Sequence, residues 1–142
     1  MGQTNFEKLR VYQLAEQLAD LIWKIVIKWS FFAKDTVGKQ IVDAADGIGS
    51  NIAEGTGRGS LPDNRRFINI ARGCLYETKH WLRRSYKRKL LSDGEVAELK
   101  TIVDELTPKL NAYYRSVDRA AAMTKQRTKH KAPSTKNNPA DA

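Results

Sequence analysis

The chain has 142 residues, the length of a single domain with a modest core. Its 25 Lys and Arg residues outnumber 16 Asp and Glu residues, and the formal net charge of +9 favours association with polyanions such as RNA, DNA or an anionic membrane surface. A basic protein that is merely soluble is the alternative. One cysteine excludes an internal disulfide, and two histidines argue against a metal cluster or a catalytic triad.

The N-terminus and the most apolar segment carry no targeting signal. Met1 to Phe6 lack a basic start and a hydrophobic run, so neither export nor lipidation is predicted. Lys24 interrupts the apolar segment from Leu21 to Ile27, which is much shorter than the roughly 20 residues of a membrane span. Cys74 is unpaired, which fits a reducing compartment. We expect a cytoplasmic protein with no membrane partner, no cofactor and no metal.

The first predicted helix covers residues 6–29, where apolar residues recur three or four positions apart. This core stripe consists of Val11, Ala15, Leu18, Ile22, Ile25 and Trp29. A second row, which includes Tyr12, Trp23 and Ile27, makes the apolar face wider than one core contact requires. In a small monomer that row would be an exposed patch, so we interpret it as a subunit interface. A broad helix in a single core is the alternative.

Residues 30–34 are predicted to connect to a second helix at 36–56, capped by Asp35 or Thr36. Its core stripe consists of Ile41, Ala45, Ile48 and Ile52. Three glycines, Gly38, Gly47 and Gly49, each weaken a helix by about 1 kcal/mol relative to alanine. We therefore expect them to permit close approach of a neighbouring helix.

A polar motif interrupts the end of this second helix. It consists of Ser50, Asn51, Glu54, Gly55, Gly57 and Arg58. Asn51, Glu54 and Arg58 share one side of the helix beside the core stripe, so we interpret them as a network that fixes helix register or subunit geometry. A catalytic base at Glu54 is the alternative. The glycines are expected to end the helix with left-handed backbone, and not to form a phosphate loop, because no strand precedes them.

The third predicted helix, residues 61–90, carries the strongest charge signal. Ser60 is its predicted cap. The apolar rows leave two outer tracks to basic residues, over roughly 33 Å at about 1.5 Å per residue. The cations proposed to contact phosphates are Arg65, Arg66, Arg72, Lys79, Arg83, Arg84, Lys87 and Arg88. The alternative is a solvated face whose cations pair with acids of the fourth helix, such as Asp104, Glu105 and Asp118.

The fourth predicted helix, residues 93–122, starts at a capping box formed by Ser92 and Glu95. Its core stripe is the clearest in the chain: Val96, Leu99, Val103, Leu106, Leu110, Tyr113 and Val117. Pro108 predicts a kink, and the stripe continuing in phase argues against a break.

Residues 124–142 lose this periodicity and are predicted to form a disordered basic tail. Lys125, Arg127, Lys129 and Lys131 are its candidate nucleic-acid contacts. An inert solubilising end is the alternative.

Three stretches carry a resemblance to a known family. They are Ser50 to Arg58 (Ser-Asn-Ile-Ala-Glu-Gly-Thr-Gly-Arg), preceded by Ala44-Ala45, then Phe67 to Gly73, and Leu75 to Thr78. The chain resembles the bacterial four-helix-bundle family of 23S rRNA intervening-sequence proteins over roughly residues 6–117. Accessory variability proteins of diversity-generating retroelements look like a branch of that family. The resemblance implies a bundle subunit in a homopentamer, and suggests a reverse transcriptase and its template RNA as partners.

The chain departs from the family pattern in three places. Gly47-Ile48-Gly49 replaces bulkier residues, Pro108 interrupts the fourth helix, and the basic run with its tail is heavier than usual. The first two affect the packing expected of the bundle, and the third favours polyanion binding.

Together these patterns predict an all-α protein in which residues 1–123 form an antiparallel up-down-up-down four-helix bundle. The predicted function is non-enzymatic binding of nucleic acid, RNA or DNA, through phosphate contacts made by an oligomer. The alternative is an accessory protein of a diversity-generating retroelement that binds a reverse transcriptase and its template RNA.

Overall fold

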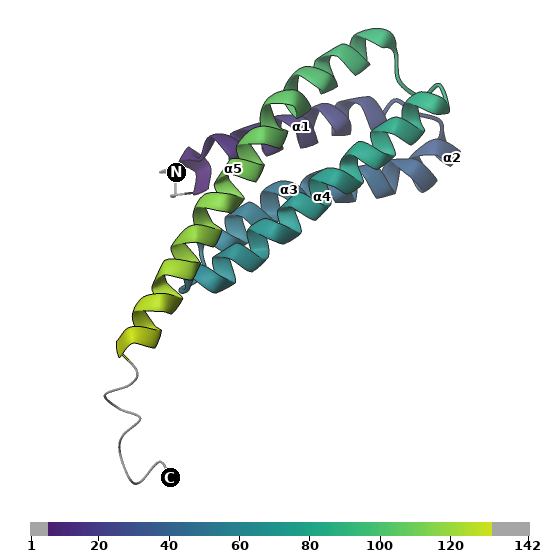
Figure 1. The fold of residues 1–142 in the computed structure, drawn as a ribbon. Coiled ribbons are helices and arrows are strands. Elements are labelled where there is room, and N and C mark those ends of the chain that lie inside the picture. The colour runs from purple at the N-terminus through teal and green to yellow at the C-terminus, as the bar shows by residue number, and fades with distance from the viewer. Residues whose placement is uncertain (1–5, 132–142) are drawn as a thin grey trace.

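The computed structural model describes residues 6–131. Four long helices make up most of it: α1 (Arg10–Val26), α3 (Lys39–Thr56), α4 (Leu61–Lys87) and α5 (Asp93–Lys131). Short helical segments are η1 (Phe6–Lys8), α2 (Phe31–Ala33) and η2 (Lys34–Gly38). Residues 6–131 contain no strand, so this part of the chain is an all-helical bundle, as predicted. In Figure 1 the long helices lie alongside one another, and α5 extends past the others at its C-terminal end.

The core lies between the long helices, since α3 packs on α1 and α4, and α5 packs on α1 and α4. The largest side chains that are fully buried there are Leu14, Leu18, Ile22, Ile41, Ile48, Ile52, Ile68, Leu75, Leu106 and Leu110. Burying an aliphatic side chain of this size stabilises a fold by about 1.5–3 kcal/mol. All four stripe residues predicted for α3 are buried, and the α5 stripe is buried or half-buried along its length. The periodicity of the sequence therefore identified the core faces correctly.

Two predicted helix caps are confirmed. The backbone N–H of Asp63 donates to Ser60 Oγ at 3.3 Å at the start of α4. At the start of α5 the Ser92 N–H donates to Glu95 Oε1 at 2.8 Å, and the Glu95 N–H donates to Ser92 Oγ at 3.1 Å. These side chains satisfy amides that the helix itself leaves without acceptors, which fixes where α4 and α5 begin.

The second helical region starts earlier than predicted, so the expected connection at residues 30–34 and the cap at Asp35 or Thr36 are wrong. Ser30 is the cap, since its Oγ accepts from the N–H of Ala33 at 3.4 Å. Helical structure then runs from Phe31 through one π-helical segment, Lys34–Gly38, into α3. Thr36 Oγ1 donates to the carbonyl of Phe32 at 2.7 Å, one turn back, so a residue read as a cap lies inside the helical region.

Close approach explains two of the three helix glycines. A Cβ at Gly47 would lie 2.9 Å from Cys74 Sγ, and a Cβ at Gly38 would lie 2.8 Å from Val26 Cγ1. Neither contact is sterically allowed, so α3 can pack this tightly on α4 only with glycine at position 47. At Gly49 the nearest atom would be Tyr12 Cε1 at 3.5 Å, which is ordinary contact.

The end of α3 differs from the prediction of left-handed glycines. Gly57 has φ −80° and ψ −6°, and no glycine among residues 6–131 has a positive φ. Gly55 lies inside α3 and is buried, and a Cβ there would lie 2.8 Å from Asn64 Oδ1 and 3.0 Å from Phe67 Cβ. It is therefore required by the close approach of the first turns of α4 and not by a backbone reversal.

The last helix is longer than predicted. α5 is continuous through Pro108 and extends to Lys131, so residues 124–131 are helical and the predicted disordered tail does not begin at residue 124. The physical reason lies in composition, because Ala120 to Ala122, Lys125 and Arg127 are strong helix formers. The rest of the predicted tail, residues 132–142, lies outside the described residues. None of the helices within 6–131 is both long and apolar enough to cross a bilayer.

Candidate nucleic-acid interface

The cations in the first half of α4 are held by neighbouring residues. Arg65 Nη1 forms an ion pair with Asp118 Oδ1 of α5 at 3.2 Å. Arg66 Nη2 pairs with Asp63 Oδ1 at 3.1 Å, and its guanidinium lies 4.4 Å from the centroid of the Phe67 ring. For Arg65 the structure therefore bears out the alternative reading, a cation paired with an acid of the fourth helix.

Arg72 is the most engaged of these cations. Its Nε donates to Asn111 Oδ1 of α5 at 2.9 Å, and its Nη1 donates to Asn69 Oδ1 at 3.0 Å. Its guanidinium also lies 4.3 Å from the centroid of the Tyr114 ring. A planar guanidinium with two hydrogen bonds and an aromatic contact is positioned to join α4 to α5, so a phosphate would have to compete with these contacts for its orientation.

The cations in the last two turns of α4 are different. Arg83, Arg84, Lys87 and Arg88 form no ion pair and no side-chain hydrogen bond with any residue in the range 6–127, whose side chains are described; we call them the α4 cation cluster. Arg84 is half-buried and the other three are exposed. Like charges this close together create a positive potential that reaches about one Debye length, roughly 8 Å at physiological salt. Lys79, one turn earlier, lies over the Tyr76 ring, with its Nζ 5.0 Å from the ring centroid.

Lys89 extends this cluster and was not identified from the sequence. The Leu90 N–H donates to the carbonyl of Ser85 at 2.9 Å, and the Lys89 N–H donates to the carbonyl of Tyr86 at 3.0 Å. This pair of bonds ends α4 in a Schellman motif, which requires left-handed backbone at Lys89, where φ is 60°. Glycine is the usual residue at this left-handed position and the usual sequence signal for such a turn, so the lysine did not indicate one.

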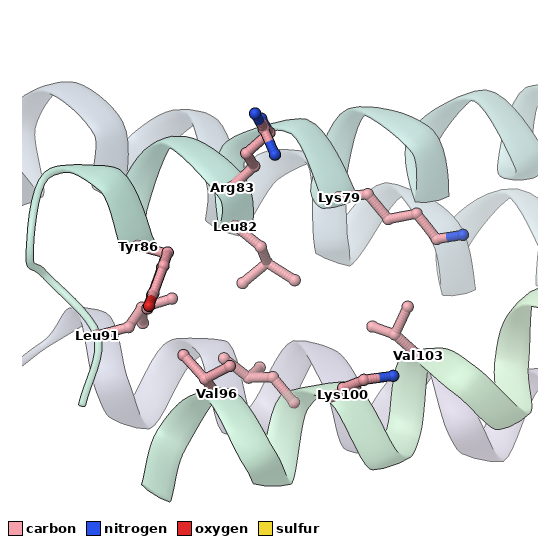
Figure 2. Close-up of a pocket in the computed structure, with 9 residues that line it drawn as sticks. Lys79, Leu82, Arg83, Tyr86, Leu91, Val96, Lys100 and Val103 are labelled. Carbon is pink, nitrogen blue, oxygen red and sulfur yellow. The ribbon is translucent and has the colours of Figure 1, made fainter. Parts of the chain in front are cut away.

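An open groove of about 310 Å³ lies beside the cluster, between the last turns of α4 and the first turns of α5. Its floor is formed by Leu82, Leu91, Val96, Leu99 and Val103, and three cations, Lys79, Arg83 and Lys100, lie along its sides. Figure 2 shows Leu82 pointing toward Val96 and Val103 across the groove, with Tyr86 beside Leu91 at one end. We call this feature the α4–α5 groove. The sequence placed Val96, Leu99 and Val103 in the core stripe of the fourth helix and did not predict a groove.

The polar motif forms two separate groups of contacts. Asn51 Nδ2 donates to the carbonyl of Gly47 at 2.8 Å and lies 3.9 Å from Cys74 Sγ. Ser50 Oγ also donates to that carbonyl, at 3.3 Å. Both residues therefore support the point where α3 meets α4 most closely.

Arg58 is at the centre of the second group. Its Nη2 pairs with Glu54 Oε1 at 3.1 Å and its Nε with Asp63 Oδ2 at 3.4 Å, and its guanidinium lies 4.6 Å from the Phe67 centroid. These contacts join the end of α3 to the start of α4.

Burial raises the pKa of the Cys74 thiol, which disfavours the nucleophilic thiolate there. Among residues 6–127, whose side chains the structure describes, no three His, Cys, Asp or Glu gather as a metal site would require.

The predicted interface residues on α1 have different surroundings. Trp23 and Ile27 are more than half exposed, whereas Tyr12 is half-buried, with its OH 3.3 Å from Glu16 Oε2. Phe31 and Phe32, 79% and 77% exposed, follow on α2. Trp23, Ile27, Phe31 and Phe32 form what we call the α1–α2 apolar patch. Phe31 and Phe32 lie in the segment that was predicted to connect two helices, so the predicted interface did not include them.

The predicted basic residues do not form one surface. Figure 1 shows the α4–α5 connection and the C-terminal end of α5 at opposite ends of the bundle, so Lys125 and Arg127, both exposed, lie far from the α4 cation cluster. The side chains of Lys129 and Lys131 lie outside the described residues. The motif around Arg58 is also at the end away from the cluster, because α3 ends where α4 begins.

Comparisons with known proteins agree with this architecture. The family model for the 23S rRNA-intervening sequence protein matches residues 7–112. The fold is similar to the crystal structure of a protein with unknown function from the S23 ribosomal protein family of Bacteroides thetaiotaomicron, with a TM-score of 0.65 and 21% sequence identity. The match covers 73% of this chain and 97% of that one. No curated protein sequence matches the chain. From the residues matched, the chain belongs to the 23S rRNA-intervening sequence protein family.

Proposed function

We propose that the protein binds nucleic acid without acting on it as an enzyme, and that the α4 cation cluster holds the phosphates. The observation that carries the proposal is that Arg83, Arg84, Lys87 and Arg88 have no carboxylate partner among residues 6–131, although the same helix pairs Arg65 and Arg66 with acids. Cations left unpaired on one surface attract a polyanion, because phosphate contacts release bound counterions. The single unpaired cysteine supports a cytoplasmic setting for this role.

The proposal narrows the set of contacts predicted from the sequence. Arg65 and Arg72 are assigned to joining α4 to α5, Arg66 to contacts within α4, and Lys79 and the α4 cation cluster to phosphate binding. Lys125 and Arg127 are at the far end of α5 and would add only diffuse attraction. Phosphate contacts position a protein without reading bases, so little sequence preference is expected from them.

The test is a titration of labelled single-stranded RNA, duplex RNA and duplex DNA at several salt concentrations. With all four cluster residues changed to alanine, affinity should fall about 10- to 100-fold near 0.1 M salt, and the slope of log K against log salt should shrink by roughly 3. The matched control removes the same charge away from the cluster and from the α1–α2 apolar patch, by changing the exposed Lys8, Arg115, Arg119 and Lys125 to alanine. An equal loss in both variants would contradict a site on α4 and leave only general attraction.

We further propose that the bundle is antiparallel and up-down-up-down and assembles through the α1–α2 apolar patch. Neighbouring long helices that pack in chain order support the topology, and exposed aromatic side chains support assembly. The family resemblance suggests five copies. Trp23→Glu combined with Phe31→Glu should shift the mass measured by light scattering to that of a monomer, while Tyr12→Phe should leave it unchanged.

The α1–α2 apolar patch also favours a second candidate, an accessory protein of a diversity-generating retroelement that binds a reverse transcriptase and its template RNA. The patch would then contact a different protein. A gene for a reverse transcriptase next to this one, and co-purification that the Trp23→Glu, Phe31→Glu variant abolishes, would support this candidate over self-assembly.

A further inference from the structure

The α4–α5 groove has the character of a binding site and not of a packing defect. Its volume of about 310 Å³ is at the lower end of the range for small-molecule sites, roughly 300–1,000 Å³. Leu82, Leu91, Val96 and Val103 are only half-buried, so their apolar surface is in contact with water. Covering that surface with an apolar body would be favourable by about 25 cal/mol for each Å² removed from water.

The charges around the groove select an anionic occupant. Lys79, Arg83 and Lys100 line it, and no Asp or Glu does. Lys100 is paired with Asp104, but Arg83 has no partner among residues 6–131, and the rest of the α4 cation cluster continues beyond the groove. Figure 2 shows the Arg83 guanidinium pointing away from α5, outside the apolar floor. The ligand therefore has an apolar part for the floor and several negative charges outside it.

Tyr86 adds an aromatic surface at one end of this groove. Its side chain is 52% exposed although it adjoins the apolar floor, and it lies on α4 between Arg83 and Lys87. Aromatic rings placed among cations are how proteins hold single-stranded nucleic acid, since bases stack on the ring while phosphates follow the positive charge. A fatty acid would fill the floor but would use only one of the cations.

We propose that the α4–α5 groove receives an unpaired base of a single-stranded nucleic acid, stacked on Tyr86, with the neighbouring phosphates on the α4 cation cluster. The inference rests on the proposed nucleic-acid binding and adds its substrate class. Bases within a duplex are paired and stacked, and a base enters such a groove only after it leaves the stack. The protein therefore prefers single strands over duplexes of the same length.

The experiment compares the affinities of the full chain for single-stranded and duplex RNA at one salt concentration. Tyr86→Ala should weaken single-strand binding by about five- to 100-fold, the usual effect of losing one stacked base, and leave duplex binding unchanged. Tyr86→Phe should restore the preference, because it keeps the ring. Val96→Trp, which fills the groove from α5, should abolish the preference as Tyr86→Ala does. The matched control is Tyr76→Ala, which removes another half-exposed tyrosine of α4; its ring contacts Lys79 but does not line the groove, so any loss of affinity that it causes should be equal for single strands and duplexes.

The possible results separate this inference from the function on which it rests. If the α4 cluster variant loses binding but Tyr86→Ala and Val96→Trp change nothing, the groove is not a base site, while phosphate binding stands. If the unmodified protein binds neither form of RNA, both proposals fail. Decanoate that binds in the groove of the unmodified protein, without any single-strand preference in RNA binding, would assign the groove to a simple amphipathic anion and overturn the inference.

Discussion

The two halves of α4 have similar basic sequences but different surroundings. In the first half, α5 presents Asp118 and Asn111 to Arg65 and Arg72. In the second half, no acid at the start of α5 pairs with the cluster: Glu95 caps Ser92, Asp104 binds Lys100, and Asp93 and Glu98 form no ion pair with its four residues. The α4 cation cluster is therefore left without partners among residues 6–131. A run of cations on one helix says little about function until the neighbouring helix shows which charges it neutralises.

The largest effect is expected from removing Arg72, a cation of the first half of α4. Arg72→Ala eliminates two hydrogen bonds and the contact with the Tyr114 ring, and should lower the free energy of unfolding by about 1–3 kcal/mol. Affinity for RNA, measured where both proteins are folded, should change less than twofold. Urea denaturation and an RNA titration check the two parts. Arg83→Ala should show the opposite pattern, with lower affinity and unchanged stability; if both variants lose affinity equally, the two halves of α4 do not differ in role.

Substitutions of Lys89 test whether a lysine is kept in the strained turn that ends α4 because of its positive charge. Lys89→Gly relieves the left-handed backbone, and the free energy of unfolding should rise by up to about 1 kcal/mol. RNA affinity should fall slightly, because one cation beside the cluster is lost. Lys89→Ala removes the same charge but keeps the unfavourable φ, so it should show the affinity loss without the gain in stability. A stability gain in the alanine variant would show that charge repulsion, not backbone strain, is relieved.

Releasing a cation in the first half of α4 should make it resemble the second half. Asp118→Asn frees Arg65 from its ion pair, so RNA affinity should rise a few-fold and the salt slope should steepen by roughly 0.7–0.9, the value for one extra phosphate contact. Stability should fall by at most about 1 kcal/mol, as for exposed ion pairs in general. Asp104→Asn is the parallel variant, because it frees a cation of α5, Lys100, beside the groove. If neither variant changes the slope of log K against log salt, phosphates reach neither Arg65 nor Lys100.

The smallest effect concerns Glu105, an acid of α5 that the alternative interpretation of the sequence paired with cations of α4. It instead receives bonds from Arg10 Nε at 2.9 Å and Nη2 at 3.0 Å, and these hold its pKa below the ordinary value. A lowered pKa in the folded state contributes stability above the pKa of the unfolded chain, and that stability is lost as pH falls through the folded value. Arg10→Ala should therefore make stability less dependent on pH in the acid range, as measured by thermal unfolding from pH 3 to 6. If stability depends on pH in Arg10→Ala as it does in the unmodified protein, the acid dependence comes from other carboxylates.

Features that depend on neighbours along one helix were predicted well. The stripe at Ile41, Ala45 and Ile48 and the capping box at Ser92 and Glu95 involve residues three or four positions apart, whose relation is fixed by helix geometry. The errors came where a local signal had two meanings. Thr36 was read as a cap but donates to the carbonyl of the previous turn, and Gly55 was read as a turn although it is needed for the approach of Asn64.

The candidate site was predicted only in part. The sequence identified the cations of α4 but not which of them are free, because that depends on Asp118, Asn111 and Asp104 in a helix that is distant along the chain. It gave no sign of the α4–α5 groove, whose floor combines Leu82 of α4 with Val96 and Val103 of α5. It missed the left-handed Lys89 as well, since no glycine marks the turn.

The sequence by itself determined the four long helices, where α3 ends, where α4 and α5 begin, the faces that enter the core and the excess of positive charge, because each depends on residue type and on spacing within one helix. Only the tertiary structure decided which cations are neutralised, where the apolar side chains of α4 and α5 leave an open groove, and that this groove adjoins the unpaired charges. Those properties depend on which residues of different helices face each other, and pairwise distances across a bundle are set by packing and not by the order of the chain.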